Sequence, residues 1–116
     1  MKLNIIEAEK LANDINSMLP KAQGIVAYAL SKNLRVLTTE LTEYGKIKSD
    51  LFQKYGETLE NGNMRIKDEN IPTFMEQMKQ FENEDINVEL RTLKESEVTE
   101  SGLNGQDMFL IDKIIE

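Results

Sequence analysis

The feature that most constrains this chain is a row of residues spaced alternately by three and four between Ile25 and Tyr55. The row consists of Ala27, Leu30, Leu34, Leu37, Leu41, Tyr44, Lys48, Leu51 and Tyr55. Such spacing places one stripe along a single amphipathic helix, and only Lys48 interrupts its apolar character. At 1.5 Å per residue the helix would be roughly 46 Å long. We therefore expect the rest of the chain to pack against it.

A shorter helix is predicted before the long one, over about residues 5–18. Asn4 and Glu7 have the spacing of a capping box at its start. Pro20 ends it, because proline lacks a backbone N–H and restricts the residue before it. The link over residues 19–24 is short, and helices joined in this way are usually antiparallel neighbours. The first 56 residues thus predict a helical hairpin.

The two predicted helices differ in length. A helix over residues 5–18 is about 21 Å long and can cover only the Ala27–Leu37 part of the row. Each large apolar side chain left bare beyond it forgoes about 1.5–3 kcal/mol of burial. Either the C-terminal half folds over the remainder or a second copy does. The sequence favours the first, and some self-association through the long helix is also expected.

The segment after the long helix predicts a turn, a strand and another helix. Gly56 is expected to end the long helix in a left-handed conformation. Asn61-Gly62 is typical of a tight turn, and a strand is predicted over residues 63–67. Thr73 and Glu76 have capping-box spacing before an apolar face that ends near Asn83. This helix is the expected cover for the bare part of the row.

The last third of the chain predicts one more strand and one more helix. Strict alternation indicates a half-buried strand from Ile86 to about Leu93, which can pair with residues 64–66. Residues 95–105 are expected to form a loop with one helical turn, and Asn104 to begin a final helix.

These patterns predict an α+β fold that is mostly α. It contains an antiparallel helical hairpin with one long central helix, a small two-stranded β-ribbon and two shorter C-terminal helices. Its 116 residues suit a single domain, with the hairpin in residues 1–56 and an acidic α/β portion in residues 57–116 packed on it.

Composition excludes several classes of function. The chain has no cysteine and no histidine, which removes disulfides, thiolate metal sites and the usual neutral-pH proton-transfer residue. No apolar run approaches the length of a membrane span, and the N-terminus lacks the pattern of a signal peptide. We expect a cytoplasmic protein that is not an enzyme, with no cofactor, no metal and no membrane partner.

Charge is distributed unevenly along the chain. Residues 1–56 carry a net charge of +2 and residues 57–116 a net charge of −9. An acidic half disfavours direct nucleic-acid binding and favours a protein partner with a basic surface, although a merely solvated acidic face would look the same. The candidate partner-binding residues are Glu82, Glu84, Asp85, Glu89, Glu95, Glu97 and Glu100.

Several short segments, in this order along the chain, resemble those of small phage and prophage proteins of Gram-positive bacteria that share a domain of unknown function. They are Leu19-Pro20-Lys21, Lys54-Tyr55-Gly56-Glu57, Asn61-Gly62-Asn63, the helix that contains Phe74 and the strand within residues 84–90. The resemblance implies a phage-encoded accessory protein in a bacterial cytoplasm. It assigns no functional residues.

Three functional hypotheses follow. The first is a non-enzymatic phage binding protein that acts through its acidic surface, for example an inhibitor of a host or anti-phage defence factor. The second is a phage structural or assembly component that oligomerises through the long helix. The third is a small-ligand-sequestering protein or an enzyme that uses carboxylates, tyrosines and backbone amides.

Overall fold

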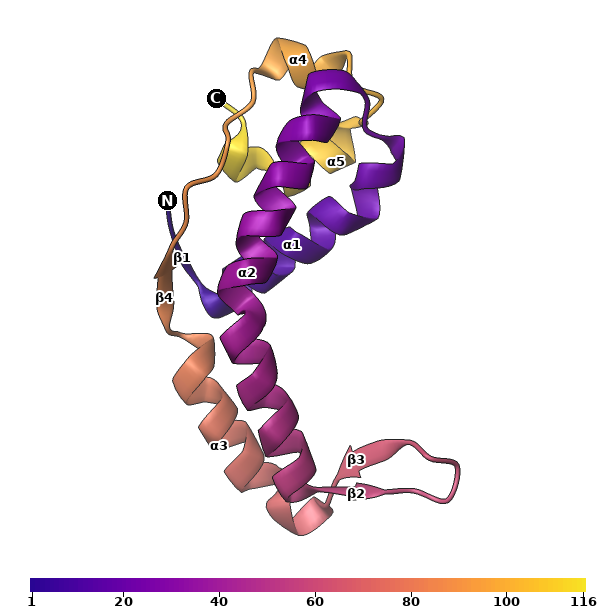
Figure 1. Ribbon diagram of the computed structural model, residues 1–116, viewed down its shortest axis with the longest axis vertical. Coiled ribbons are helices and arrows are strands. Elements are labelled where there is room, and N and C mark those ends of the chain that lie inside the picture. Colours follow the sequence, from indigo (N-terminus) through magenta and orange to yellow (C-terminus); the bar gives the residue numbers. More distant parts are fainter.

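The long helix dominates the computed structural model, which describes residues 1–116. Helix α2 runs without a break from Gly24 to Tyr55, as predicted, and spans most of the longest dimension of the molecule (Figure 1). The structure measures 52 × 32 × 21 Å and has a radius of gyration of 17.2 Å. A compact domain of this size would have a radius of gyration near 13 Å. The molecule is therefore elongated along α2.

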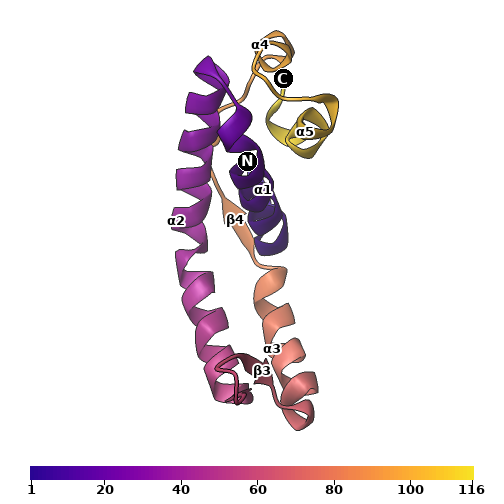
Figure 2. The ribbon, with the colours of Figure 1, turned by 90° about the vertical axis from the view of Figure 1, so that its right-hand side faces the viewer.

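Helix α1, Ile5–Met18, lies beside the first half of α2 (Figure 2). Its predicted capping box is present: the Asn4 side chain accepts a 2.7 Å hydrogen bond from the Glu7 backbone, and the Glu7 carboxylate accepts one of 3.1 Å from the Asn4 backbone. A single 3₁₀ turn, η1, covers Leu19–Lys21 and includes Pro20. The helical hairpin is thus confirmed.

One end of the molecule, called the head here, holds the main core. It is built from α1, the first half of α2, α4 (Glu95–Thr99), α5 (Gly105–Leu110) and the 3₁₀ turn η3 (Asp112–Ile114). Its core comprises 16 buried apolar residues, among them Leu30, Leu37, Ile111 and Ile114 with no exposed surface. The first half of α2 is therefore packed against several elements.

The other end, called the arm here, is built from the second half of α2 and helix α3, Ile71–Glu82. Its cluster has three buried residues, Ile5, Tyr44 and Met78. The rings of Phe52 and Phe74 meet edge to face, with centroids 5.8 Å apart. Half-buried side chains around the cluster include Leu41 and Leu51 of the row. The prediction that the C-terminal half covers this part of α2 within one chain is confirmed.

The strands pair differently from the prediction. Strand β2 (Gly56–Thr58) pairs with β3 (Met64–Ile66), and β4 (Asp85–Asn87) pairs with β1 (Lys2–Asn4), both antiparallel. The predicted pairing of residues 64–66 with residues 86–93 is wrong. The two segments are separated by α3, whose 12 residues extend about 18 Å. Two small ribbons therefore lie at opposite ends of α3 (Figure 1), where one was expected.

The predicted strand to Leu93 ends at Asn87. Beyond it the extended backbone bonds to several separate elements rather than to one neighbouring strand. The buried Asn33 side chain donates a 3.0 Å hydrogen bond to the Arg91 carbonyl and accepts one of 2.7 Å from the Arg91 backbone amide. Leu93 forms an isolated bridge with Ile115. This segment ties the two ends of the chain to α2.

Two local predictions also need correction. Gly56 is extended, with φ −94° and ψ 172°, and a Cβ there would collide with the Phe52 carbonyl oxygen. Glycine is thus required by close backbone approach and not by a left-handed conformation. Helix α3 begins at Ile71 with Pro72 in its first turn, a position that proline favours. Thr73 is therefore already inside the helix and caps nothing.

The predicted fold class is correct: the molecule is α+β, mostly α, and is organised around one long helix. No helix combines the length and apolar character needed to cross a bilayer.

Candidate functional site

The predicted acidic contact residues fall into two groups that lie at different heights along the molecule (Figure 1). The first group surrounds the turn between α3 and β4 and consists of Glu82, Glu84, Asp85 and Glu89. The second belongs to α4 and the residue after it and consists of Glu95, Glu97 and Glu100. The structure therefore does not gather all seven residues into one surface.

Most of these carboxylates have no cationic partner within the chain. Asp85 pairs with Lys2 across the β1–β4 ribbon, with 3.3 Å between the Lys2 Nζ and an Asp85 carboxylate oxygen. None of the other six forms an ion pair. Glu97 accepts a 3.1 Å hydrogen bond from the Lys94 backbone amide at the start of α4. The negative charge of the α4 group is thus available to an outside partner.

A hollow between α4 and the C-terminal turns adds residues that the sequence reasoning missed. Glu95, Asp112 and Glu116 line it together with Met108, Phe109 and Ile115. The Phe109 side chain is 80% exposed, the most exposed of the large apolar residues. An aromatic ring so exposed beside three carboxylates combines an apolar anchor with negative charge. We call these residues and the α4 carboxylates the acidic end of the head.

Phe109 could have been singled out from the sequence by its position on the final helix. The expected apolar face of that helix contains Met108, Leu110, Ile111, Ile114 and Ile115 but not Phe109. A large aromatic residue off the buried face of a helix is expected at the surface, where single apolar side chains are common. Only the structure shows that Glu95, Asp112 and Glu116 line a hollow together with this ring.

Helix α5 is held in place from both sides. Asn104 caps it by accepting a 2.9 Å hydrogen bond from the Asp107 backbone amide. The buried Asp107 carboxylate lies 2.7 Å from the Lys21 Nζ of η1, and its hydrogen bond to Lys21 lowers the pKa of that carboxyl. Because Lys21 belongs to the hairpin bend, this contact fixes α5, and with it Phe109, relative to α1 and α2.

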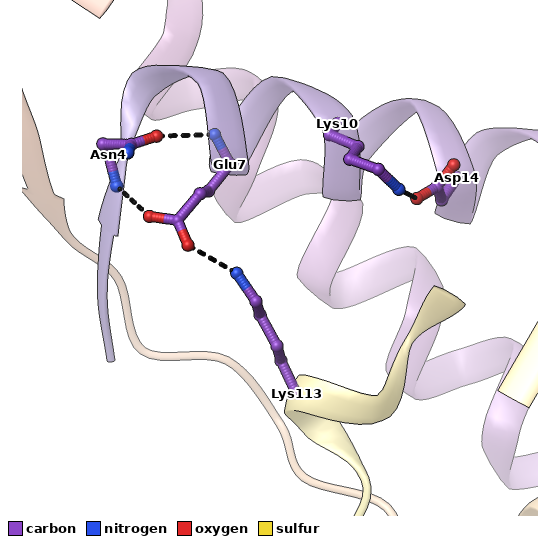
Figure 3. A network of polar contacts seen from close by, with 5 residues as sticks. All are labelled: Asn4, Glu7, Lys10, Asp14 and Lys113. Atoms are coloured by element: carbon purple, nitrogen blue, oxygen red, sulfur yellow. Dashed lines mark hydrogen bonds and ion pairs between the residues drawn. The ribbon is translucent and has the colours of Figure 1, made fainter. Parts of the chain in front are cut away.

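Phe109 also lines a second hollow, between α1 and α5. Figure 3 shows Lys113 reaching from η3 toward Glu7, with 2.6 Å between its Nζ and a Glu7 carboxylate oxygen. The hydrogen bond from Lys113, reinforced by the one from the Asn4 backbone, lowers the pKa of the Glu7 carboxyl. Lys10 and Asp14 form a separate pair on the same helix, 2.8 Å apart. The Lys113–Glu7 ion pair therefore attaches the C-terminal turns to α1.

The opposite side of α4 is anchored to the start of α2. The Gln23 backbone donates a 2.9 Å hydrogen bond to the Ser101 carbonyl, and Val98 is fully buried. Gly102 has a φ of +87°, and a Cβ there would approach the Lys21 carbonyl to 2.6 Å, so only glycine fits easily. A third hollow here brings Glu97 and Glu100 beside the exposed Ile25. Carboxylates thus border apolar side chains on both sides of α4.

The acidic end of the head places exposed carboxylates beside apolar side chains. No three Asp or Glu side chains come close enough together to hold a metal ion. Every buried side-chain nitrogen and oxygen has a hydrogen-bond partner, so no polar group points unpaired into a cavity. The surface offers negative charge and apolar contact area.

Comparisons with protein-family models, with curated proteins and with solved structures give no match.

Proposed function

We propose that this protein is a non-enzymatic binding protein. The acidic end of its head binds a basic surface of a protein partner. The observation that supports this most is Phe109, 80% exposed and bordered by Glu95, Asp112 and Glu116, none of which is in an ion pair with a lysine or arginine of the chain. Exposed aromatic side chains are frequent anchors of protein interfaces, and uncompensated charge nearby speeds encounter with an oppositely charged partner.

The expected partner places an apolar or aliphatic group against Phe109 and lysines or arginines against the surrounding carboxylates. A phage accessory role, as the resemblance implies, would make this partner a host or anti-phage defence factor that the protein inhibits. The carboxylates between α3 and β4 lie elsewhere along the molecule (Figure 1), so we assign them no part in this surface.

A direct test measures binding to a synthetic amphipathic peptide rich in lysine and leucine. The full chain should bind it, and the triple variant Glu95→Gln, Glu97→Gln, Glu100→Gln should bind at least about tenfold more weakly, because charge complementarity at the surface is removed. Fluorescence anisotropy of the labelled peptide reports the affinity. Glutamine preserves the capping hydrogen bond that Glu97 accepts.

The matched control is Glu60→Gln, Glu69→Gln, Glu76→Gln. These three glutamates are exposed and form no ion pair. They lie in the β2–β3 hairpin, before α3 and in α3. Because both variants replace three glutamates, the change in net charge is the same. An equal loss of binding in both triple variants would mean that overall charge and not the acidic end is responsible.

Phe109→Ala should weaken binding without changing its dependence on salt. Binding that is insensitive to added salt would remove the electrostatic basis of the proposal.

A further inference from the structure

The arm carries an apolar groove on the face where α1, α2 and α3 meet. Ile6, Phe52, Phe74 and Met75 are among the side chains that line it. Ile6 is 49% exposed and Met75 is 53% exposed. A neighbouring hollow shares Phe52 and reaches Met64 of β3, itself 43% exposed. Its other lining residues are Gly45 and the polar Lys48, Ser49 and Gln53, so the apolar groove ends near Phe52.

The arm is too thin to bury this surface by itself. It consists of two helices and a hairpin, with only the start of α1 added at its inner end, and its cluster holds three buried residues. Two helices side by side form a single layer, which can bury apolar side chains between the helices but not those on its open faces. A second layer of helices on the groove would convert the arm into a four-helix arrangement with an interior.

Charge at the rim of the groove indicates what that second layer is. Lys48 and Lys79 lie there with Glu9 and Glu82, so the rim has no net charge in a chain that carries −7. Lys79 and Glu82 form no ion pair within the chain, and Lys48 only a long one, with its Nζ 4.0 Å from Glu9. A partner of uniform charge would meet repulsion from half of this rim. A second copy related by a two-fold axis presents both signs in return.

We propose that the arm groove is a homodimer interface, in which the arms of two copies pack face to face over Ile6, Phe52 and Met75. Of the row along α2, Tyr44 and Lys48 line this groove. This contact lies on a different part of the molecule from the acidic end of the head. Dimer formation and binding of a basic peptide are therefore separable.

The test is the molar mass of the full chain over a concentration series, measured by light scattering and by sedimentation. We expect a monomer–dimer equilibrium, and Met75→Lys should weaken it at least about tenfold, since a charge would be buried at the centre of the contact. The matched control is Ile25→Lys, which adds the same charge at a position of similar exposure, 54%, in the head. It should leave the equilibrium unchanged.

Added salt provides a second readout. Dimerisation should not weaken as salt rises, because apolar contact drives it and salt screens the repulsion between two chains of charge −7. Binding of the basic peptide at the acidic end of the head should instead weaken as salt rises. Met75→Lys should bind that peptide as the unmodified chain does, and retained binding also shows that this variant is folded.

Cross-linking locates the contact. The chain has no cysteine, so Met75→Cys introduces a single thiol, and a short bis-maleimide should link two copies of this variant but not two copies of Ile25→Cys. A chain that stays monomeric at its highest soluble concentration would overturn the proposal. So would a dimer that Met75→Lys leaves intact or that links only through position 25.

Discussion

The head and the arm share one continuous helix but differ in how much of it they bury. In the head, α1, α4, α5 and the C-terminal turns surround the first half of α2 and form a core of 16 buried residues. In the arm only α3 and the start of α1 cover the second half, and the cluster has three buried residues. The same apolar row thus contributes differently along its length. Stability should be concentrated in the head, while the arm exposes apolar surface.

The largest expected effect is on the core of the head. Leu30 is fully buried there, and Leu30→Ala should lower the free energy of unfolding by about 3 kcal/mol through lost burial and a residual cavity. Leu51 occupies the corresponding row in the arm and is half-buried. Leu51→Ala should cost only about 1 kcal/mol. Urea unfolding of both variants checks this, and equal losses would show that the arm is as tightly packed as the head.

A smaller difference in the free energy of unfolding is expected between removing a buried polar contact in the head and removing a half-buried one in the arm. Asn33 in the head is fully buried and makes two hydrogen bonds to the Arg91 backbone. Asn33→Ala leaves both backbone groups without that partner and should cost about 2 kcal/mol. In the arm, the Gln77 side chain donates a 2.9 Å hydrogen bond to the half-buried Tyr55 hydroxyl. Gln77→Ala should cost under about 1 kcal/mol, because water can replace the amide. A larger loss for Gln77→Ala would contradict the comparison.

The smallest effect is a dependence of head stability on pH. The hydrogen bond from Lys113 holds the pKa of Glu7 below the ordinary value of 4.5. A carboxyl with a lowered pKa in the folded state adds stability above its unfolded pKa, and this stability is lost as pH falls through the folded value. Urea unfolding between pH 7 and pH 3 should therefore show a decline below about pH 4.5.

Lys113→Met tests the source of that decline. The variant should start from lower stability at neutral pH and fall less steeply in acid, because Glu7 no longer differs as much between the folded and unfolded states. Lys46→Met removes an exposed lysine from a 3.5 Å pair within α2 and should leave the slope unchanged. A slope that Lys113→Met does not alter would mean that Glu7 contributes nothing to it.

Helix boundaries were the most predictable part of the fold. The row over residues 25–55, the Asn4–Glu7 capping box and Pro20 each act within a few residues of the chain, and the structure confirms all three. Length alone predicted that the second half of α2 needs a cover, since a helix of 14 residues cannot shelter one of 32. That α3 covers it within one chain was the favoured one of two alternatives, and the structure confirms it.

The candidate site was less predictable. The seven predicted carboxylates were identified by charge along the chain, which contains no information on their separation in space. The structure divides them between two places and adds Phe109, Asp112 and Glu116 to one of them. The Lys113–Glu7 contact spans 106 positions of sequence, so no local sequence pattern predicts it.

The amino-acid sequence by itself determined the bounds of α1 and α2 and the start of α5, because capping, periodicity and proline geometry are properties of neighbouring residues. Tertiary structure alone decided which strands pair, why position 56 must be glycine and which apolar side chains stay at the surface. Those outcomes depend on how segments distant in sequence approach one another around α2. Many arrangements would satisfy the same local preferences, and only the packed molecule selects one of them.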